Sequence, residues 1–124
     1  MSIYLEDVKI LIADDQQFIR SIVRQMLRVL GARDIYDAAD GEDAWDSVIL
    51  NRPDLIIADW QMDPLNGLEL THRIRHAANS PNPYVPIIMM TGHADLDRVT
   101  QARDHGVTEF VTKPVAAKSL FNRI

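Results

Sequence analysis

Acidic side chains follow two of the short apolar segments in this sequence. Asp14 and Asp15 come directly after the segment 9–13, and Asp59 comes directly after the segment 55–58. If these segments are strands of one parallel sheet, the carboxylates lie at the same edge, because the strands of such a sheet all end there. This edge is also where the working crevice of such a sheet lies. Carboxylates within about 4–6 Å of one another repel. The pattern therefore predicts a site for a divalent cation.

The ligand types indicate which cation this is. A few hard oxygen ligands, with positions left open for water and phosphate, suit Mg²⁺ better than Ca²⁺, which prefers a fuller cage of oxygens. The chain has no cysteine, and no histidine belongs to the acidic group, so Zn²⁺ is a poor candidate. We expect Mg²⁺, for which Mn²⁺ could substitute.

Two further predicted strand ends carry groups that could neutralise a phosphoryl group. Thr91 ends the segment 87–91, and Lys113 follows the segment 109–112. With a metal bound, a carboxylate can attack phosphorus and form an acyl phosphate, provided that the phosphoryl oxygens are neutralised and held in line. The lysine ammonium, the threonine hydroxyl and backbone amides would do this. Asp59 stands alone at its strand end, so we assign it as the nucleophile and the aspartate pair as metal ligands.

Alternating strands and helices would position these groups. Apolar segments punctuated by glycine and proline predict strands, and helical periodicity fills the connections between them. The strands are predicted at 9–13, 34–39, 55–58, 87–91 and 109–112. The first, third and fourth are apolar on consecutive residues, which is typical of strands covered on both faces of a parallel sheet. The sequence predicts a doubly wound α/β fold with right-handed crossovers.

The first connection shows the clearest helical pattern. Phe18, Ile22, Met26 and Leu30 recur every four residues and predict a buried stripe, which Ile19, Val23 and Leu27 widen, and Gly31 is expected to end the helix. Four later helices are predicted around 44–51, 68–74, 96–106 and 116–124. The last of them is still apolar where it stops and has no cap, so we expect it to be cut short.

Length and composition indicate one soluble domain covering residues 1–124. A chain of 124 residues can bury one core, and its net charge of −5 disfavours nonspecific binding to nucleic acid or anionic lipid. The absence of cysteine suits a reducing compartment. Glu6, Asp7 and Lys9 near the start lead us to expect no export signal, and no apolar run reaches the roughly twenty residues needed to span a bilayer. We therefore expect a cytoplasmic protein that binds neither membranes nor nucleic acid.

The chain resembles the receiver domains of two-component response regulators, including the single-domain chemotaxis regulators. The resemblance covers essentially the whole chain and is carried by the acidic pair in IADDQ, the aspartate in IIADWQM, Gly67 eight residues after that aspartate, and the segments MMTGHA and TKPV. It implies a five-stranded sheet of order 2-1-3-4-5 in a flavodoxin-like three-layer sandwich. It also implies a signalling domain, not an enzyme, that catalyses its own phosphorylation and dephosphorylation. The donor would be a histidine kinase or a histidine phosphotransfer protein.

The resemblance implies further roles around the metal. Asp15 would be a direct ligand, Asp14 would act mainly through water, and the backbone carbonyl of Gln61 would be another ligand. The side chains of Gln61 and His93 would tune how long the phosphoryl group survives.

The resemblance also implies a switch and an output surface. Phe110 would turn inward when the Thr91 hydroxyl swings toward the phosphoryl group. The signal would leave through the face formed by the helix at 96–106, the strand at 109–112 and the helix at 116–124. A homodimer could form through that same face.

Other interpretations account for parts of the pattern. The aspartate pair could cap the first helix, and Thr91 and Lys113 could be an ordinary strand residue and a solvated cation. A magnesium phosphatase of the haloacid dehalogenase type would need a second aspartate at the position of Gln61. A flavodoxin-like cofactor binder would need a phosphate-cradling loop where the chain reads ADDQQ. A receiver-like docking module that is never phosphorylated is the remaining alternative.

Two histidines on the third predicted helix have the spacing of a helical zinc pair. His72 and His76 lie four residues apart, but no glutamate follows His72, and Arg73 and Arg75 lie between them. The sequence alone favours a basic, solvated helix face here.

Overall fold

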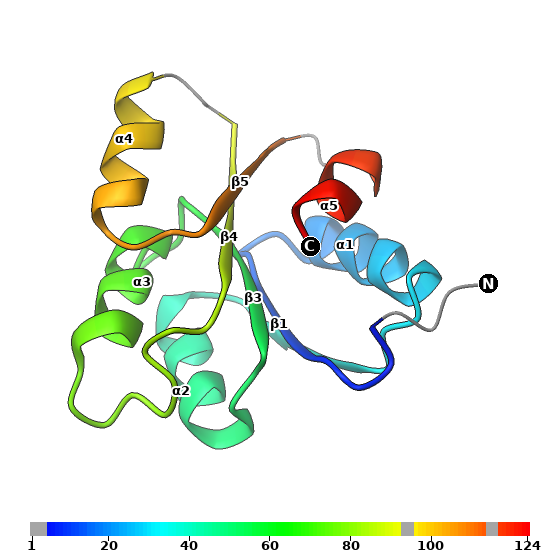
Figure 1. The fold of residues 1–124 in the computed structure, drawn as a ribbon, viewed down its shortest axis with the longest axis horizontal. Helices are drawn as coiled ribbons and strands as arrows, with labels where there is room; N and C mark the ends of the chain where they lie inside the picture. The colour runs from blue at the N-terminus through cyan, green and yellow to red at the C-terminus, as the bar shows by residue number, and fades with distance from the viewer. Residues whose placement is uncertain (1–4, 93–95, 114–116) are drawn as a thin grey trace.

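The protein is described by a computed structural model that covers residues 5–92, 96–113 and 117–124. Within these residues, strands and helices alternate from the first strand to the last helix (Figure 1). The elements are β1 Lys9–Ala13, α1 Gln17–Val29, β2 Asp34–Ala38, α2 Gly41–Asn51, β3 Leu55–Asp59, α3 Gly67–His76, β4 Ile87–Thr91, α4 Leu96–Asp104, β5 Glu109–Thr112 and α5 Ala117–Arg123.

The strands form one parallel sheet of order β2-β1-β3-β4-β5, as the family resemblance implied. The observed strands β1, β4 and β5 have the predicted bounds, while β2 ends one residue earlier, at Ala38. Strand β3 extends one residue further than predicted, because Asp59 pairs with Met90 of β4 in the ladder. The backbone that carries the Asp59 carboxylate is therefore part of the sheet.

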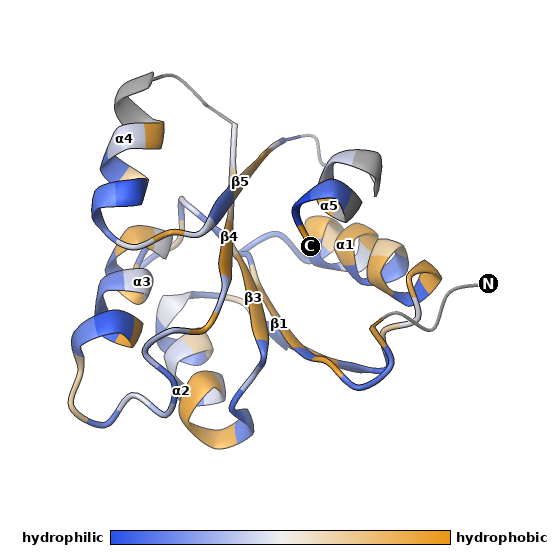
Figure 2. Cartoon of the chain, in the orientation of Figure 1, coloured by the Kyte–Doolittle hydropathy of each residue, from blue (hydrophilic) through white to orange (hydrophobic). Residues whose placement is uncertain are grey.

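Helices cover both faces of the sheet, which explains why the central strands are apolar on consecutive residues. Helices α1 and α5 lie on one side, and α2, α3 and α4 lie on the other (Figure 1). Ile10 and Ile12 of β1 pack with residues of α1 and α5, whereas Leu11 and Ala13 pack with residues of α2 and α3. Figure 2 shows the hydrophobic colouring concentrated on β1, β3 and β4. This three-layer arrangement confirms the predicted fold class.

The predicted buried stripe of α1 is partly wrong. Phe18, placed at the start of that stripe, is 74% exposed, and the fully buried residues of the helix are Val23 and Leu27. Phe18 lies in the first turn of α1, two residues before Arg20, whose side chain donates a hydrogen bond to the carbonyl oxygen of Asp14. Gly31 ends the helix as predicted, with a φ of 97° that an L side chain rarely adopts.

Among the residues that the structure describes, no helix has both the length and the apolar character needed to cross a membrane.

Candidate functional site

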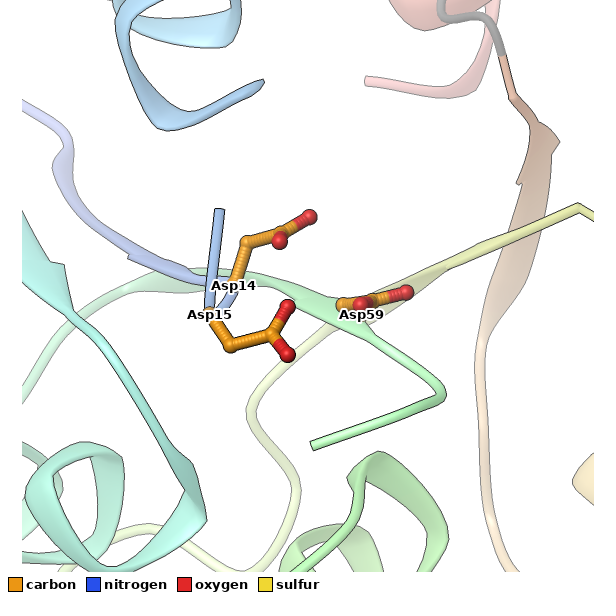
Figure 3. Close-up of side chains that lie close together, drawn as sticks. All are labelled: Asp14, Asp15 and Asp59. Carbon is orange, nitrogen blue, oxygen red and sulfur yellow. The ribbon is translucent and has the colours of Figure 1, made fainter. Parts of the chain in front are cut away.

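The three aspartates come together at the carboxyl edge of the sheet. Asp14 and Asp15 follow β1, and Asp59 ends β3, the strand paired directly with β1. One carboxylate oxygen of each residue lies within 4.8 Å of the corresponding oxygens of the other two (Figure 3). Asp14 and Asp59 are buried, and Asp15 is exposed at the mouth. Two buried acids and one solvent-facing acid therefore surround one small volume.

Lys113 joins this group from the end of β5. Its Nζ lies 3.0 Å from Oδ2 of Asp14 and 3.2 Å from Oδ1 of Asp59. Its backbone N–H donates a 2.8 Å hydrogen bond to the carbonyl oxygen of Thr91, so the lysine is tied to the end of β4 as well. The ammonium is thus shared between the two buried carboxylates.

A pocket of about 280 Å³ opens over these side chains. Its walls come from the segments that follow β1, β3, β4 and β5. The lining residues are Asp15, Gln16, Asp59, Trp60, Gln61, Thr91, Gly92 and Lys113. All of the predicted site residues that the structure describes, apart from Asp14 and Phe110, therefore line one pocket, and Asp14 lies directly behind it through its contact with Lys113.

The backbone around Asp59 is held by an unusually close helix start. A Cβ added to Gly67 would lie 2.4 Å from the carbonyl oxygen of Asp59 and 2.8 Å from Sδ of Met89. The N–H of Gly67 donates to the carbonyl oxygen of Trp60 at 3.0 Å. Only glycine lets α3 approach the loop after β3 this closely, which gives a physical reason for the glycine eight residues after Asp59.

Asp14 is held by two contacts that sequence reasoning did not identify. Its Oδ1 accepts a 2.8 Å hydrogen bond from the N–H of Gln16. Its carbonyl oxygen accepts a 2.5 Å hydrogen bond from Arg20, whose Nε also lies 3.5 Å from Oδ2 of Asp37 at the end of β2. No local motif marks Arg20 as different from the other arginines of α1, because its role depends on where β2 places Asp37.

Burial and mutual repulsion strain the acidic group. Burial raises the pKa of Asp59, the charge of Asp14 raises it further, and Lys113 only partly offsets these effects. Burial also raises the pKa of Asp14 against the hydrogen bond from Gln16 and the contact with Lys113. Burial by itself would lower the pKa of Lys113, but its contacts with the two carboxylates outweigh this and leave its pKa raised. Ionised carboxylates are therefore costly here without further positive charge.

The residues fit a hard divalent cation. Oδ2 of Asp14 is fully buried and accepts no hydrogen bond in the described structure, although Lys113 lies close to it. The available ligands are all oxygens, with the exposed carboxylate of Asp15 open to the pocket. Mg²⁺ prefers such ligands and keeps several waters, which matches an acidic group with an open mouth.

The remaining predicted site residues have different outcomes. Gln61 is exposed and lines the pocket. Phe110 is half-buried and packs against the cluster that contains Trp60 and Met89, and it does not line the pocket. His93 lies outside the described residues.

A parallel sheet of order 2-1-3-4-5 with three carboxylates and a lysine at its carboxyl edge defines a receiver type of signalling domain. The family model described as "Response regulator receiver domain" matches residues 10–124. The chain belongs to the response regulator receiver domain family, as the sequence motifs indicated. Receiver domains of this family generally use Mg²⁺, and the aspartate group at the sheet edge fits their phosphorylation site.

Relatives in sequence agree with this assignment. The chain is 32% identical over 117 residues to the chemotaxis protein CheY of Pseudomonas aeruginosa, covering 94% of this chain and 93% of that protein. It is 38% identical over 111 residues to a protein-glutamate methylesterase/protein-glutamine glutaminase of Haloarcula marismortui, covering 88% of this chain. The chain spans only 29% of the length of that second protein.

Solved structures show the same fold. The chemotaxis response regulator CheY4 of Vibrio cholerae has a TM-score of 0.84 at 28% identity, with 93% of each chain covered. The receiver domain of the Francisella response regulator 1452 has a TM-score of 0.83 at 26% identity, with 94% of this chain and 93% of that chain covered.

Proposed function

We propose that Asp59 is the phosphoacceptor of this receiver domain and that Asp14, Asp15 and the carbonyl oxygen of Gln61 hold the Mg²⁺ that the reaction requires. The observation that carries the proposal is the position of Asp59. It is buried within 4.8 Å of two other carboxylates and 3.2 Å from the Lys113 ammonium. A nucleophile in that position has the Lys113 ammonium beside it, and the pocket that it lines gives a phosphoryl donor access to it.

The reaction is a direct phosphoryl transfer. A carboxylate oxygen of Asp59 forms a bond to phosphorus while the bond from phosphorus to the imidazole nitrogen of a phosphohistidine breaks, and the imidazole takes up a proton on leaving. Lys113 binds one phosphoryl oxygen and the Thr91 hydroxyl binds another, which stabilises the charge that develops in the transition state. When bound, Mg²⁺ would neutralise the remaining phosphoryl oxygen and relieve the repulsion among the carboxylates.

The response to phosphorylation begins at Thr91 and passes to the α4, β5 and α5 face. Thr91 ends β4 and pairs with Thr112 of β5, and Phe110 lies two residues earlier on the same strand. A movement of the Thr91 side chain toward the phosphoryl group would open space into which the half-buried Phe110 ring turns. The output partner would bind this face, or a second copy of the chain would.

Water access to the phosphorylated site would depend on Gln61 and His93. Gln61 is exposed at the pocket mouth, where its side chain can orient or obstruct an attacking water. We assign both residues to tuning the lifetime of the phosphorylated form.

The physiological donor would be a sensor histidine kinase or a histidine phosphotransfer protein in the cytoplasm, since family membership implies such partners. The domain would act as a signalling component and not as an enzyme on external substrates. The position two residues after Asp59 is Gln61, so the acid that an aspartyl phosphatase uses there is missing. The methylesterase and glutaminase activities named for the Haloarcula protein are those of a much longer chain.

Incubation with acetyl phosphate and Mg²⁺ tests this function. Intact-mass measurement should show one added phosphoryl group on the wild-type protein and none on Asp59→Asn. Asp46→Asn, which changes an exposed carboxylate on α2, is the matched control and should be modified like the wild type. An unmodified wild-type mass would favour the docking module, and continuous turnover of a generic phosphate ester would favour the phosphatase.

A further inference from the structure

A second groove, of about 680 Å³, lies between α3 and the end of α4. It shares no lining residue with the acidic pocket. Figure 1 shows α3 and α4 on the same side of the sheet. Three of the four histidines of the chain line the groove: His72 and His76 from α3, and His105 from the residue that follows α4. Two segments that are distant in the sequence thus bring three imidazoles to one surface.

The two arginines that lie between the α3 histidines are directed to other partners. Arg75 donates to the carbonyl oxygens of Gly106, Pro83 and Val85 at 2.6–3.0 Å. Arg73 lies with its guanidinium 5.5 Å from the ring centroid of Trp45, and its NH1 is 3.5 Å from a carboxylate oxygen of Glu42. The charge of Arg75 is therefore engaged elsewhere, whereas Arg73 also lines the groove and contacts Trp45 and Glu42.

Two of the ring separations are near that of rings that share a metal ion, although the ligand nitrogens of the three histidines do not all lie within 4.8 Å of one another in this arrangement. The ring centroids of His72 and His76 are 4.5 Å apart, and those of His72 and His105 are 6.4 Å apart. A Zn–N bond of about 2.0–2.1 Å and tetrahedral geometry place the centroids of two ligating rings roughly 5 Å apart. The two separations lie on either side of this value. His72 and His76 are exposed and His105 is half-buried, so rotations of their side chains can close the difference.

The hydrogen bond of His105 prepares it as a ligand. Its Nδ1 lies 2.7 Å from the carbonyl oxygen of Gln101. A carbonyl oxygen can only accept, so Nδ1 carries the proton and Nε2 of the neutral ring has a free lone pair. Histidines that bind metals commonly donate their other ring N–H to a backbone carbonyl in this way.

We propose that His72, His76 and His105 form a binding site for a divalent transition-metal ion of the imidazole-preferring class, such as Zn²⁺, separate from the Mg²⁺ site. Imidazole suits zinc, copper and nickel, whereas Mg²⁺ prefers oxygen. The bound ion would tie the end of α4 to α3 and so restrain an element of the proposed output face.

Zinc titration in saturating Mg²⁺ tests the proposal, because Mg²⁺ competes with zinc for the acidic pocket. Calorimetry should give one zinc equivalent, and the imidazole proton resonances of the three groove histidines should shift together. Loss of even a hydrogen-bonding partner of a metal ligand costs about 10–100-fold in affinity, so His72→Gln and His105→Gln should each weaken zinc binding by at least about tenfold. Arg103→Gln, an exposed α4 variant outside the groove lining, should bind zinc like the wild type.

Circular dichroism of each variant establishes that it is folded, which separates loss of a ligand from loss of structure. Cobalt(II) provides a second readout, since a tetrahedral site with imidazole ligands gives it a visible spectrum. No heat and no resonance shift at micromolar zinc would overturn the proposal. Equal zinc affinity in the wild type and both histidine variants would also overturn it. Zinc binding that is lost only in His93→Gln or Asp59→Asn would place the ion in the acidic pocket and would overturn it as well.

Discussion

The ammonium of Lys113 lies 3.2 Å from Oδ1 of Asp59, within contact distance of the carboxylate that we assign as the nucleophile. The contact crosses from β5 to β3, two strands that are not neighbours in the sheet. Because the same Nζ also contacts Asp14, this one side chain links the proposed phosphoacceptor to one of the proposed metal ligands.

Replacing Lys113 by Met should slow phosphorylation of Asp59 strongly while leaving the protein folded. The charge that would bind a phosphoryl oxygen is lost, and loss of one such group costs about 10²–10³ in rate. The rate with acetyl phosphate and Mg²⁺ can be followed by intact mass. Lys9→Met, at the exposed start of β1 at the opposite edge of the sheet, is the control and should react at the wild-type rate. Equal rates in the two variants would remove Lys113 from the reaction.

Asp59→Asn should stabilise the metal-free protein at neutral pH. The variant removes a buried charge that is repelled by Asp14, and we expect a gain of roughly 1–3 kcal/mol in the free energy of unfolding. The pKa of Asp59 is raised on folding, so the folded wild type binds more protons than the unfolded chain, and its stability falls as pH rises through that pKa. The advantage of the variant should therefore shrink as the pH is lowered.

Urea unfolding in the presence of a chelator measures this difference. Added Mg²⁺ should stabilise the wild type more than the variant and so reduce the gap, because a ligand stabilises the state that binds it. A variant less stable than the wild type in chelator would show that the carboxylates are not under strain.

Gly67→Ala should destabilise the fold, although alanine is normally the better helix residue. The added Cβ would lie 2.4 Å from the carbonyl oxygen of Asp59, so either α3 or the end of β3 must shift. Overpacking of this kind costs about 1–3 kcal/mol. Gly92→Ala is the matched control for unfolding measurements, because a Cβ there meets no atom within 4 Å. Similar stability losses in the two variants would contradict the close approach of α3 to β3.

Arg20→Met should weaken Mg²⁺ binding by roughly tenfold, the scale expected when a group that orients a metal ligand is lost. Arg20 holds the carbonyl oxygen of Asp14, whereas Arg24→Met, the control, loses only an ion pair with Asp37. In a Trp45→Phe background, the emission of Trp60, which lines the acidic pocket, reports the Mg²⁺ titration. If both arginine variants bind Mg²⁺ equally well, Arg20 does not position Asp14.

The sequence predicted the sheet and most of the acidic site because both depend on local patterns. The run 87–90 is apolar throughout, and the polar Thr91 follows it directly, so strand bounds and the shared edge could be read from one chain. The order of the sheet came from the family resemblance. The carboxylate group needed only that order, because β1 and β3 are then neighbours.

The parts that the sequence did not predict depend on distant contacts. The exposure of Phe18 depends on how α1 lies against the sheet, and the role of Arg20 depends on its contacts with Asp14 and Asp37. The third groove histidine, His105, lies 33 positions after His72 and reaches it only because α4 packs beside α3. Periodicity carries no information of this kind.

The central claim is that the phosphoryl group forms an acyl phosphate on Asp59. Borohydride reduces an aspartyl phosphate to homoserine, so treating the phosphorylated protein with borohydride and sequencing its peptides by mass spectrometry locates the acceptor. We expect homoserine at position 59 and at no other position, and no homoserine when Mg²⁺ is withheld. Homoserine at position 14 or 15, or phosphate that remains on a threonine after reduction, would contradict it.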